Sequence, residues 1–175
     1  MIDFSKLAEQ YKHELLEQVI PFWMNHSIDT QFGGFLHCLE RDGSVFDTDK
    51  FVWMQGREVW MLSKLYNKVH EPTVSAETRQ QWLDAAIQGA EFLKSKAHDG
   101  NLNFYFSLDR EGHPLVEPYN IFSYTFAVIA FGQLALATGN EEYADIARRT
   151  FDIVLSKVDN PKGRWNKAAS GSRAM

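Results

Sequence analysis

Residues 53 to 57 bring together an aromatic and a basic side chain in a pattern that suits sugar binding. Trp53 and Arg57 are four positions apart, so on a helix both lie on the same face. An indole offers a flat apolar surface for the C–H groups of a sugar, and a guanidinium offers a fixed fork of donors for its oxygens. The guanidinium would also stabilise an enolate-like charge on a carbonyl oxygen. From spacing alone, the alternative is a structural arginine paired with a carboxylate between helices.

Gln55 lies near the same helix end and is predicted to contact the same substrate. Acid–base chemistry at such a site needs two groups that titrate near neutrality, commonly His or Glu. The six histidines lie in segments expected to be outer helices, hairpins or loops, and are interpreted as surface or packing residues: His13, His26, His37, His70, His98 and His113. They lack metal-ligand spacing such as His-x-x-x-His, so no metal site is predicted. The sequence also has no Gly-rich phosphate loop and no Gly-x-Ser-x-Gly motif.

The elements that would position these residues are mainly helices. Five segments have helical apolar periodicity, at about 3–24, 54–69, 76–97, 121–138 and 141–158. The first, third and fifth have one apolar and one charged face, which predicts outer helices. The second and fourth are apolar on most faces, which predicts inner helices covered on both sides. Gly139 is expected to end the fourth helix in a left-handed conformation.

Two short β-hairpins are expected between helices, at 35–46 and 103–116, each turning at an acidic residue followed by glycine. Their turns share one pattern, with Arg41 and Arg110 lying 69 positions apart. The same offset sets the helices in phase and places Phe122 opposite Trp53. Phe122 is therefore predicted to line the same pocket, with a plain core position as the alternative. Alternating outer and inner helices at a fixed period predict an all-α stack of helix pairs, closed into a ring or open.

Composition narrows the classes of protein that fit. The chain has 175 residues, 45% of them hydrophobic, and a net charge of −5, which suits a globular domain. No basic stripe is present, so nucleic acid is not an expected partner. The longest nearly apolar run, 121–137, is too short and polar to span a membrane comfortably. With Cys38 as the one cysteine and no apolar leader near Met1, a cytoplasmic protein is predicted.

The last segment of the sequence, 159–175, is polar and follows a predicted outer helix. An outer helix in such a stack needs an inner partner after it, so the inner face of the fifth helix is expected to be exposed. Residues 1–175 are accordingly predicted to form one partial domain.

Several short strings of residues occur together in one order along the chain. They are Phe32-Gly33-Gly34-Phe35, Trp53-Met54-Gln55-Gly56-Arg57-Glu58-Val59-Trp60, Tyr119-Asn120-Ile121-Phe122-Ser123, Asn160-Pro161-Lys162-Gly163 and Gly171-Ser172-Arg173. On these strings the chain resembles the N-acylglucosamine 2-epimerase family, also known through the renin-binding protein. The resemblance implies an (α/α)6 barrel, of which this chain would be the N-terminal portion, with about five helices and two short hairpins.

The resemblance also implies an activity. The family interconverts N-acyl-D-glucosamine and N-acyl-D-mannosamine by removing and returning the proton at C2 of the ring-opened sugar, without a metal. It implies a sugar contact for Arg57 and a pocket or phosphate contact for Arg173. ATP or another purine nucleotide would be an activator. The family's acid and base histidines would lie beyond residue 175, so this chain alone is predicted to be inactive.

Two other readings stay open. A glycoside hydrolase or lyase with the same barrel would need two carboxylates facing across the sugar, but Asp42 and Glu111 are turn residues that the repeat already explains. A non-enzymatic half-barrel could bind another copy of itself, which makes a homodimer possible, or act as a binding module. The sugar itself could be N-acylated, free or a disaccharide.

Overall fold

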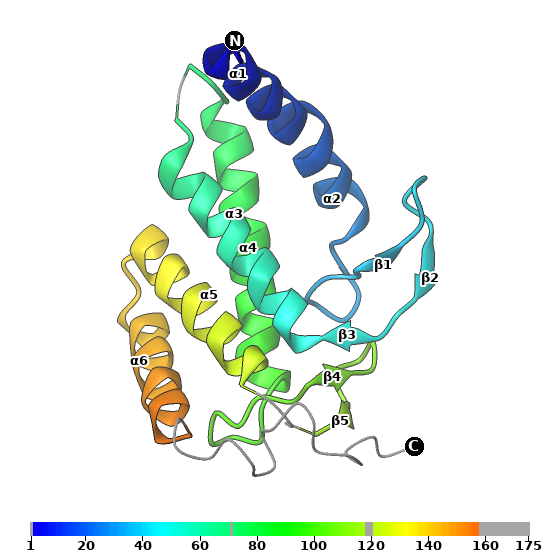
Figure 1. The fold of residues 1–175 in the computed structure, drawn as a ribbon. Helices are drawn as coiled ribbons and strands as arrows, with labels where there is room; N and C mark the ends of the chain where they lie inside the picture. Colours follow the sequence, from blue (N-terminus) through cyan, green and yellow to red (C-terminus); the bar gives the residue numbers. More distant parts are fainter. Residues whose placement is uncertain (1, 71, 118–120, 158–175) are drawn as a thin grey trace.

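The computed structural model describes residues 2–70, 72–117 and 121–157, and it is mostly helical (Figure 1). The first predicted helix is divided into three parts, α1 (Phe4–Glu14), a π-helical turn η1 (Leu15–Val19) and α2 (Ile20–His26). Pro21 stands in the first turn of α2. Because proline lacks an N–H and crowds the carbonyl four residues earlier, a widened π turn lets the helix continue past it.

The other four helices follow the predicted segments closely: α3 (Val52–Lys68), α4 (Ala76–Lys96), α5 (Phe122–Thr138) and α6 (Glu141–Ser156). Ser75 caps α4 by accepting a hydrogen bond from the amide of Thr78, and Asn140 caps α6 in the same way. Gly139 ends α5 with φ of +69°, which confirms the predicted left-handed cap.

Both predicted hairpins are present, as β1 (Cys38–Leu39) with β2 (Val45–Asp47) and as β4 (Ser107–Leu108) with β5 (Pro114–Val116). Cys38 pairs with Asp47 in the first hairpin and Ser107 pairs with Val116 in the second. Both members of the second pair lie 69 positions after those of the first, so the repeat holds in the strand register. The turn glycines, Gly43 and Gly112, both have positive φ.

One strand was not predicted, β3 (Lys50–Phe51), which pairs antiparallel with β4 and gives a three-stranded sheet in the order β3-β4-β5. Two residues are too few for an alternating pattern to be visible in sequence. The strand matters because it leads directly into α3, and the amide of Val52 donates to the carbonyl of Phe106 in the second hairpin. The start of α3 is therefore fixed to the second hairpin.

The helices alternate as predicted, with α3 and α5 packed side by side, α4 against α3 and α6 against α5 (Figure 1). Gly56 allows the close approach of the inner pair, because a Cβ there would lie 2.9 Å from the backbone of Phe126. The core is formed by buried side chains from all four helices and the hairpin segments, among them Phe35, Val59, Leu62, Leu93, Phe104, Tyr124, Phe131 and Leu134.

Two apolar surfaces, one on α1 and one on α5, are less buried than the sequence predicts. The stripe of the first helix stays exposed, with Phe4 75% and Tyr11 61% accessible, and α5 leaves Leu136 78% accessible. In the described residues α5 is therefore covered by α3 and α6 but keeps an exposed apolar strip. On α6, Phe151 and Leu155 are also about half exposed, as expected for an outer helix with no described inner helix after it. No helix among the described residues is long and apolar enough to cross a membrane.

Candidate functional site

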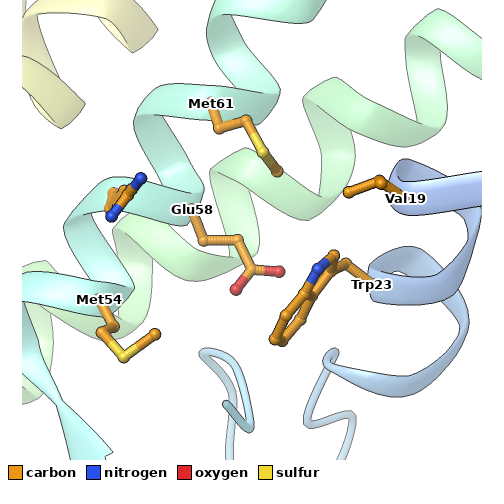
Figure 2. Close-up of a pocket in the computed structure, with 6 residues that line it drawn as sticks. Val19, Trp23, Met54, Glu58 and Met61 are labelled. Atoms are coloured by element: carbon orange, nitrogen blue, oxygen red, sulfur yellow. The ribbon is translucent and has the colours of Figure 1, made fainter. Parts of the chain in front are cut away.

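A cavity of about 240 Å³ lies between the η1–α2 segment and the first turns of α3 (Figure 2). It is lined by Val19, Trp23, Met54, Arg57, Glu58 and Met61. Four of these side chains come from α3, whose start is held by β3 and the second hairpin. The lining combines apolar and sulfur-containing surface with one basic and one acidic group, and only Arg57 among these six was predicted as a site residue.

Glu58 and Trp23 point toward one another across this cavity (Figure 2). The Ser27 hydroxyl donates to Oε1 of Glu58 at 2.6 Å, and Ser27 is fully buried at the end of α2. Part of Glu58 faces the cavity, but burial of its carboxyl raises the pKa to about 7, against the opposing effect of the Ser27 hydrogen bond. Glu58 therefore exchanges a proton close to neutral pH.

Arg57 is exposed at the edge of the cavity. Within the described residues it forms no hydrogen bond and no ion pair. The structural alternative, an arginine paired with a carboxylate between helices, therefore finds no such carboxylate in this part of the chain. A guanidinium held on the first turns of an anchored helix is available to a ligand with oxygen acceptors.

Trp53 shares a helix with Arg57 but not the cavity. Its half-buried indole packs against the ring of Phe126 on α5, with ring centroids 5.7 Å apart and planes at 51°. The structure thus places the predicted aromatic surface at the junction of the two inner helices, and Trp23 supplies the indole that lines the cavity.

Gln55 has no exposed surface. Its Oε1 accepts from the amide of Phe35 at 2.9 Å, and its Nε2 donates to the carbonyl of Phe35 at 2.7 Å. Nε2 also lies 2.7 Å from Nε2 of His37, which then accepts. A Cβ on Gly34 would meet Gln55 Oε1 at 2.6 Å, so this glycine is required. The geometry gives Gln55 a structural role, because it joins the string at 53–60 to the string at 32–35. Its substrate contact stays a prediction.

The remaining predicted residues lie elsewhere. Phe122 is the first residue of α5, about half exposed and outside the cavity lining, and Arg173 lies outside the described residues. No histidine is among the six lining residues. Burial, with a smaller contribution from Lys50, lowers the pKa of His37 to about 4. In the described part of the chain no group of three or more His, Cys, Asp or Glu could hold a metal ion.

A buried ion cluster fastens the loop after α2 to β3 and to the turn of the second hairpin. Nζ of Lys50 donates to Oδ2 of Asp29 at 2.9 Å and to the carbonyls of Gly33 and Arg110. The guanidinium of Arg110 also donates to both oxygens of Asp29, at 3.0 and 3.2 Å. Burial would raise the pKa of Asp29, but the hydrogen bonds from Arg110 and Lys50 outweigh it and hold this pKa well below its ordinary value. The cluster holds the segment that follows α2 next to the strand that leads into α3.

Sequence reasoning missed Glu58, Trp23 and Ser27. The signal for Glu58 was its place on a predicted inner helix, where a carboxylate must find a partner or a cavity. Ser27 lies 31 positions away, and nothing local connects the two residues.

Comparison with known proteins gives consistent matches. The family model described as N-acylglucosamine 2-epimerase (GlcNAc 2-epimerase) matches residues 34–173. The N-acylglucosamine 2-epimerase of Rattus norvegicus is 39% identical over 162 residues, which are 91% of this chain and 38% of the relative. A cellobiose 2-epimerase of Ruminococcus albus is 29% identical over 159 residues, covering 87% of this chain and 38% of that relative. The chain thus spans less than two-fifths of the length of these relatives.

Solved structures agree on the fold. A sugar epimerase from a ruminal bacterium superposes with a TM-score of 0.74 at 25% identity, over 86% of this chain and 37% of the other. A D-mannose isomerase superposes with a TM-score of 0.71 at 21% identity, over 84% and 36%. The predicted fold class, the N-terminal portion of an (α/α)6 barrel, is confirmed.

Proposed function

Because the chain belongs to the N-acylglucosamine 2-epimerase family, we propose that it forms the sugar-contacting part of a sugar 2-epimerase. The observation that carries this proposal is Arg57, an exposed guanidinium without a described protein partner on the anchored first turns of an inner helix. A ring-opened 2-acylamino sugar presents a carbonyl oxygen beside C2. Removal of the C2 proton moves charge onto that oxygen, where a guanidinium stabilises it.

The substrate that we propose is an N-acyl-D-glucosamine or N-acyl-D-mannosamine. Support comes from the degree of similarity, since the N-acylglucosamine 2-epimerase relatives are 36–39% identical to this chain. The cellobiose 2-epimerase relatives are 25–29% identical. An apolar indole at Trp23 beside the guanidinium suits the C–H face of such a sugar.

The proton transfers need an acid and a base on opposite faces of C2. No histidine lines the cavity beside Arg57 among the described residues, and Ser27 engages Glu58. We therefore expect binding of the sugar without turnover by this chain alone. A purine nucleotide such as ATP remains part of the proposal as an activator, and no metal is invoked.

The test is a titration of the purified chain with N-acetyl-D-mannosamine, followed by tryptophan fluorescence. We expect a saturable change that is lost in Arg57→Ala and partly kept in Arg57→Lys. Arg148→Ala, which removes an exposed arginine from α6, serves as the matched control and should bind like the parent. Binding that is unchanged in Arg57→Ala would contradict the proposal. So would epimerisation by the chain alone that disappears in Glu58→Gln, because Glu58 would then be the base.

A further inference from the structure

A second cavity lies between the α1–η1 segment and the loop that leads from α3 to α4. Its volume is about 250 Å³. This end of α3 lies beside α1 and away from the hairpins (Figure 1). Lys68, which lines the second cavity, follows Arg57 on α3 by about three helical turns, or roughly 16 Å. The second cavity is therefore separate from the one beside Arg57.

Aliphatic and cationic side chains line this second cavity together. Leu15, Leu16 and Val69 contribute aliphatic surface, and Lys12 and Lys68 contribute two ammonium groups. No carboxylate is among the lining residues in the described part of the chain. Two like charges beside one cavity repel each other, and an anion placed between them relieves that repulsion. The charges therefore select an anionic ligand, and the aliphatic surface selects one with an apolar part.

Both ammonium groups are available to such a ligand. Nζ of Lys12 lies 3.9 Å from Oε2 of Glu9, and both side chains of this ion pair are at least half exposed. Exposed pairs of this kind contribute little to stability, so a bound anion competes with Glu9 at small cost. The side chain of Lys68 forms no hydrogen bond and no ion pair within the described residues.

The alternative is that these lysines only stabilise helix ends, where positive charge offsets the helix dipole. At the end of α3 other groups already engage the carbonyls. The amide of Val69 donates to the carbonyl of Leu65 at 2.8 Å, and Nη2 of Arg79 donates to that of Tyr66 at 2.8 Å. Lys12 stands where α1 continues directly into η1, so it has no free helix end to stabilise. The alternative thus leaves the convergence of two lysines on one cavity unexplained.

Two turns hold the sides of the second cavity in place. In the loop after α3, the amide of Thr73 donates to the carbonyl of His70 at 2.9 Å, and both residues line the cavity. On the other side, Leu15 and Leu16 belong to the π-helical turn η1. Single π turns within α-helices are frequent at functional sites. The turn that lets the helix continue past Pro21 therefore also supplies aliphatic surface to a cavity.

We propose that the second cavity binds a phosphate monoester whose organic part is small and apolar. Two ammonium groups balance the charge of the phosphate, for which lysine is a common protein ligand. The imidazole of His70 and the hydroxyl of Thr73 add hydrogen-bond donors for its oxygens. The aliphatic surface covers the organic part, which leaves water when the ligand binds. This site does not rest on the sugar contact proposed for Arg57.

The test is a titration of the purified chain with phenyl phosphate at low ionic strength, followed by ¹H–¹⁵N NMR. We expect saturable shifts of the amides of Leu16, Val69 and Thr73. Phenyl phosphate should bind at least about tenfold more tightly than inorganic phosphate, because its ring buries apolar surface. Phenol, which has the ring without the charge, should not saturate the same amides. Equal affinities for phenyl phosphate and inorganic phosphate would overturn the proposal, and so would equal affinities for phenyl phosphate and phenol.

Variants locate the bound anion. In Lys12→Gln and in Lys68→Gln the affinity for phenyl phosphate should fall about tenfold, since each removes a charged hydrogen-bond donor. Lys6→Gln is the matched control, because it removes the same charge from an exposed position of α1 outside the lining, and it should bind like the parent. An equal loss in Lys6→Gln would show that net charge alone attracts the anion. Unchanged binding in both cavity variants would place the anion elsewhere, and either result would overturn the proposal.

Discussion

The α1–η1–α2 segment and α4 hold the same place in successive repeats, yet they differ in how much they bury. Eight residues of α4 are buried, whereas Ile20 is the one buried residue in the first segment. Both carry an apolar stripe, so the difference comes from their neighbours. α4 packs on α3, the inner helix that precedes it, and no described inner helix precedes α2. In this fold an outer helix is buried by the repeat before it.

The largest effect is expected where the two repeats are locked together. Asp29→Ala leaves Lys50 buried beside Arg110 without its carboxylate, and should lower the free energy of unfolding by about 3–5 kcal/mol. The corresponding residue of the second repeat is Asp99, 70 positions later, as Ala97 is from Ser27 in equivalent backbone hydrogen bonds. Asp99 is exposed and accepts hydrogen bonds only within its own turn. Asp99→Ala should cost about 1 kcal/mol. Urea denaturation of both variants measures the contrast, and equal losses would contradict a special role for the buried cluster.

A second pair compares the helices directly. Leu93 on α4 is fully buried, so Leu93→Ala should cost about 2–5 kcal/mol. The corresponding residue of the first repeat is Trp23, 70 positions earlier; it is larger but only partly buried and faces the open cavity. Trp23→Ala should therefore cost less than Leu93→Ala, since the partly accessible indole loses less burial. Urea denaturation of the two variants decides the order. If Trp23→Ala is the more damaging change, the first segment is better packed than its exposed stripe indicates.

A third prediction concerns pH. The pKa of Glu58 is about 7 in the folded protein, above its ordinary value, so this group binds more protons folded than unfolded and its stabilisation is lost as pH rises from about 4.5 to 7. The pKa of His37 is lowered to about 4, which gives the opposite slope between about 4 and 6.5.

The two effects should largely cancel in the parent chain. In Glu58→Gln the free energy of unfolding should therefore rise more steeply between pH 5 and 7 than in the parent, by about 2 kcal/mol at most. Chemical denaturation across that range measures the two slopes. Identical slopes would show that the Glu58 carboxyl titrates as an ordinary exposed group.

The smallest effect is expected on the exposed stripe of α1. Tyr11→Ser should change the free energy of unfolding of the chain alone by less than about 0.5 kcal/mol, because Tyr11 is mostly exposed. Thermal melts followed by circular dichroism would detect a larger change. A loss above 1 kcal/mol would place α1 in an interface that the described residues do not contain.

Much of the fold could be read from sequence because its signals are local. Helix periodicity, Ser75 and Asn140 at helix starts, and the Asp-Gly and Glu-Gly turns each depend on a few adjacent residues, and the 69-residue offset follows from comparing them. The π turn at η1 was not predicted. Pro21 cannot donate the usual helical hydrogen bond, and the widened turn before it lets the helix continue, which the apolar periodicity does not reveal.

The site was harder to predict because it depends on pairs distant in sequence. Ser27 with Glu58 and Phe35 with Gln55 are long-range contacts, and nothing in the spacing showed that Gln55 would be buried while Arg57 stays exposed. Family resemblance directed attention to Arg57. The direction of each neighbouring side chain became clear only in three dimensions.

The most direct test of the central claim, that this chain supplies the sugar contact of a 2-epimerase, is turnover in the assembled complex. The chain, co-expressed and co-purified with the segment of the Rattus norvegicus N-acylglucosamine 2-epimerase beyond its 162 matched residues, would be incubated with N-acetyl-D-mannosamine. Formation of N-acetyl-D-glucosamine would be followed by NMR. We expect turnover only when both chains are present, a loss of about a hundredfold or more in Arg57→Ala, and no loss in Arg148→Ala. Full turnover with Arg57→Ala, or by the partner segment alone, would contradict the claim.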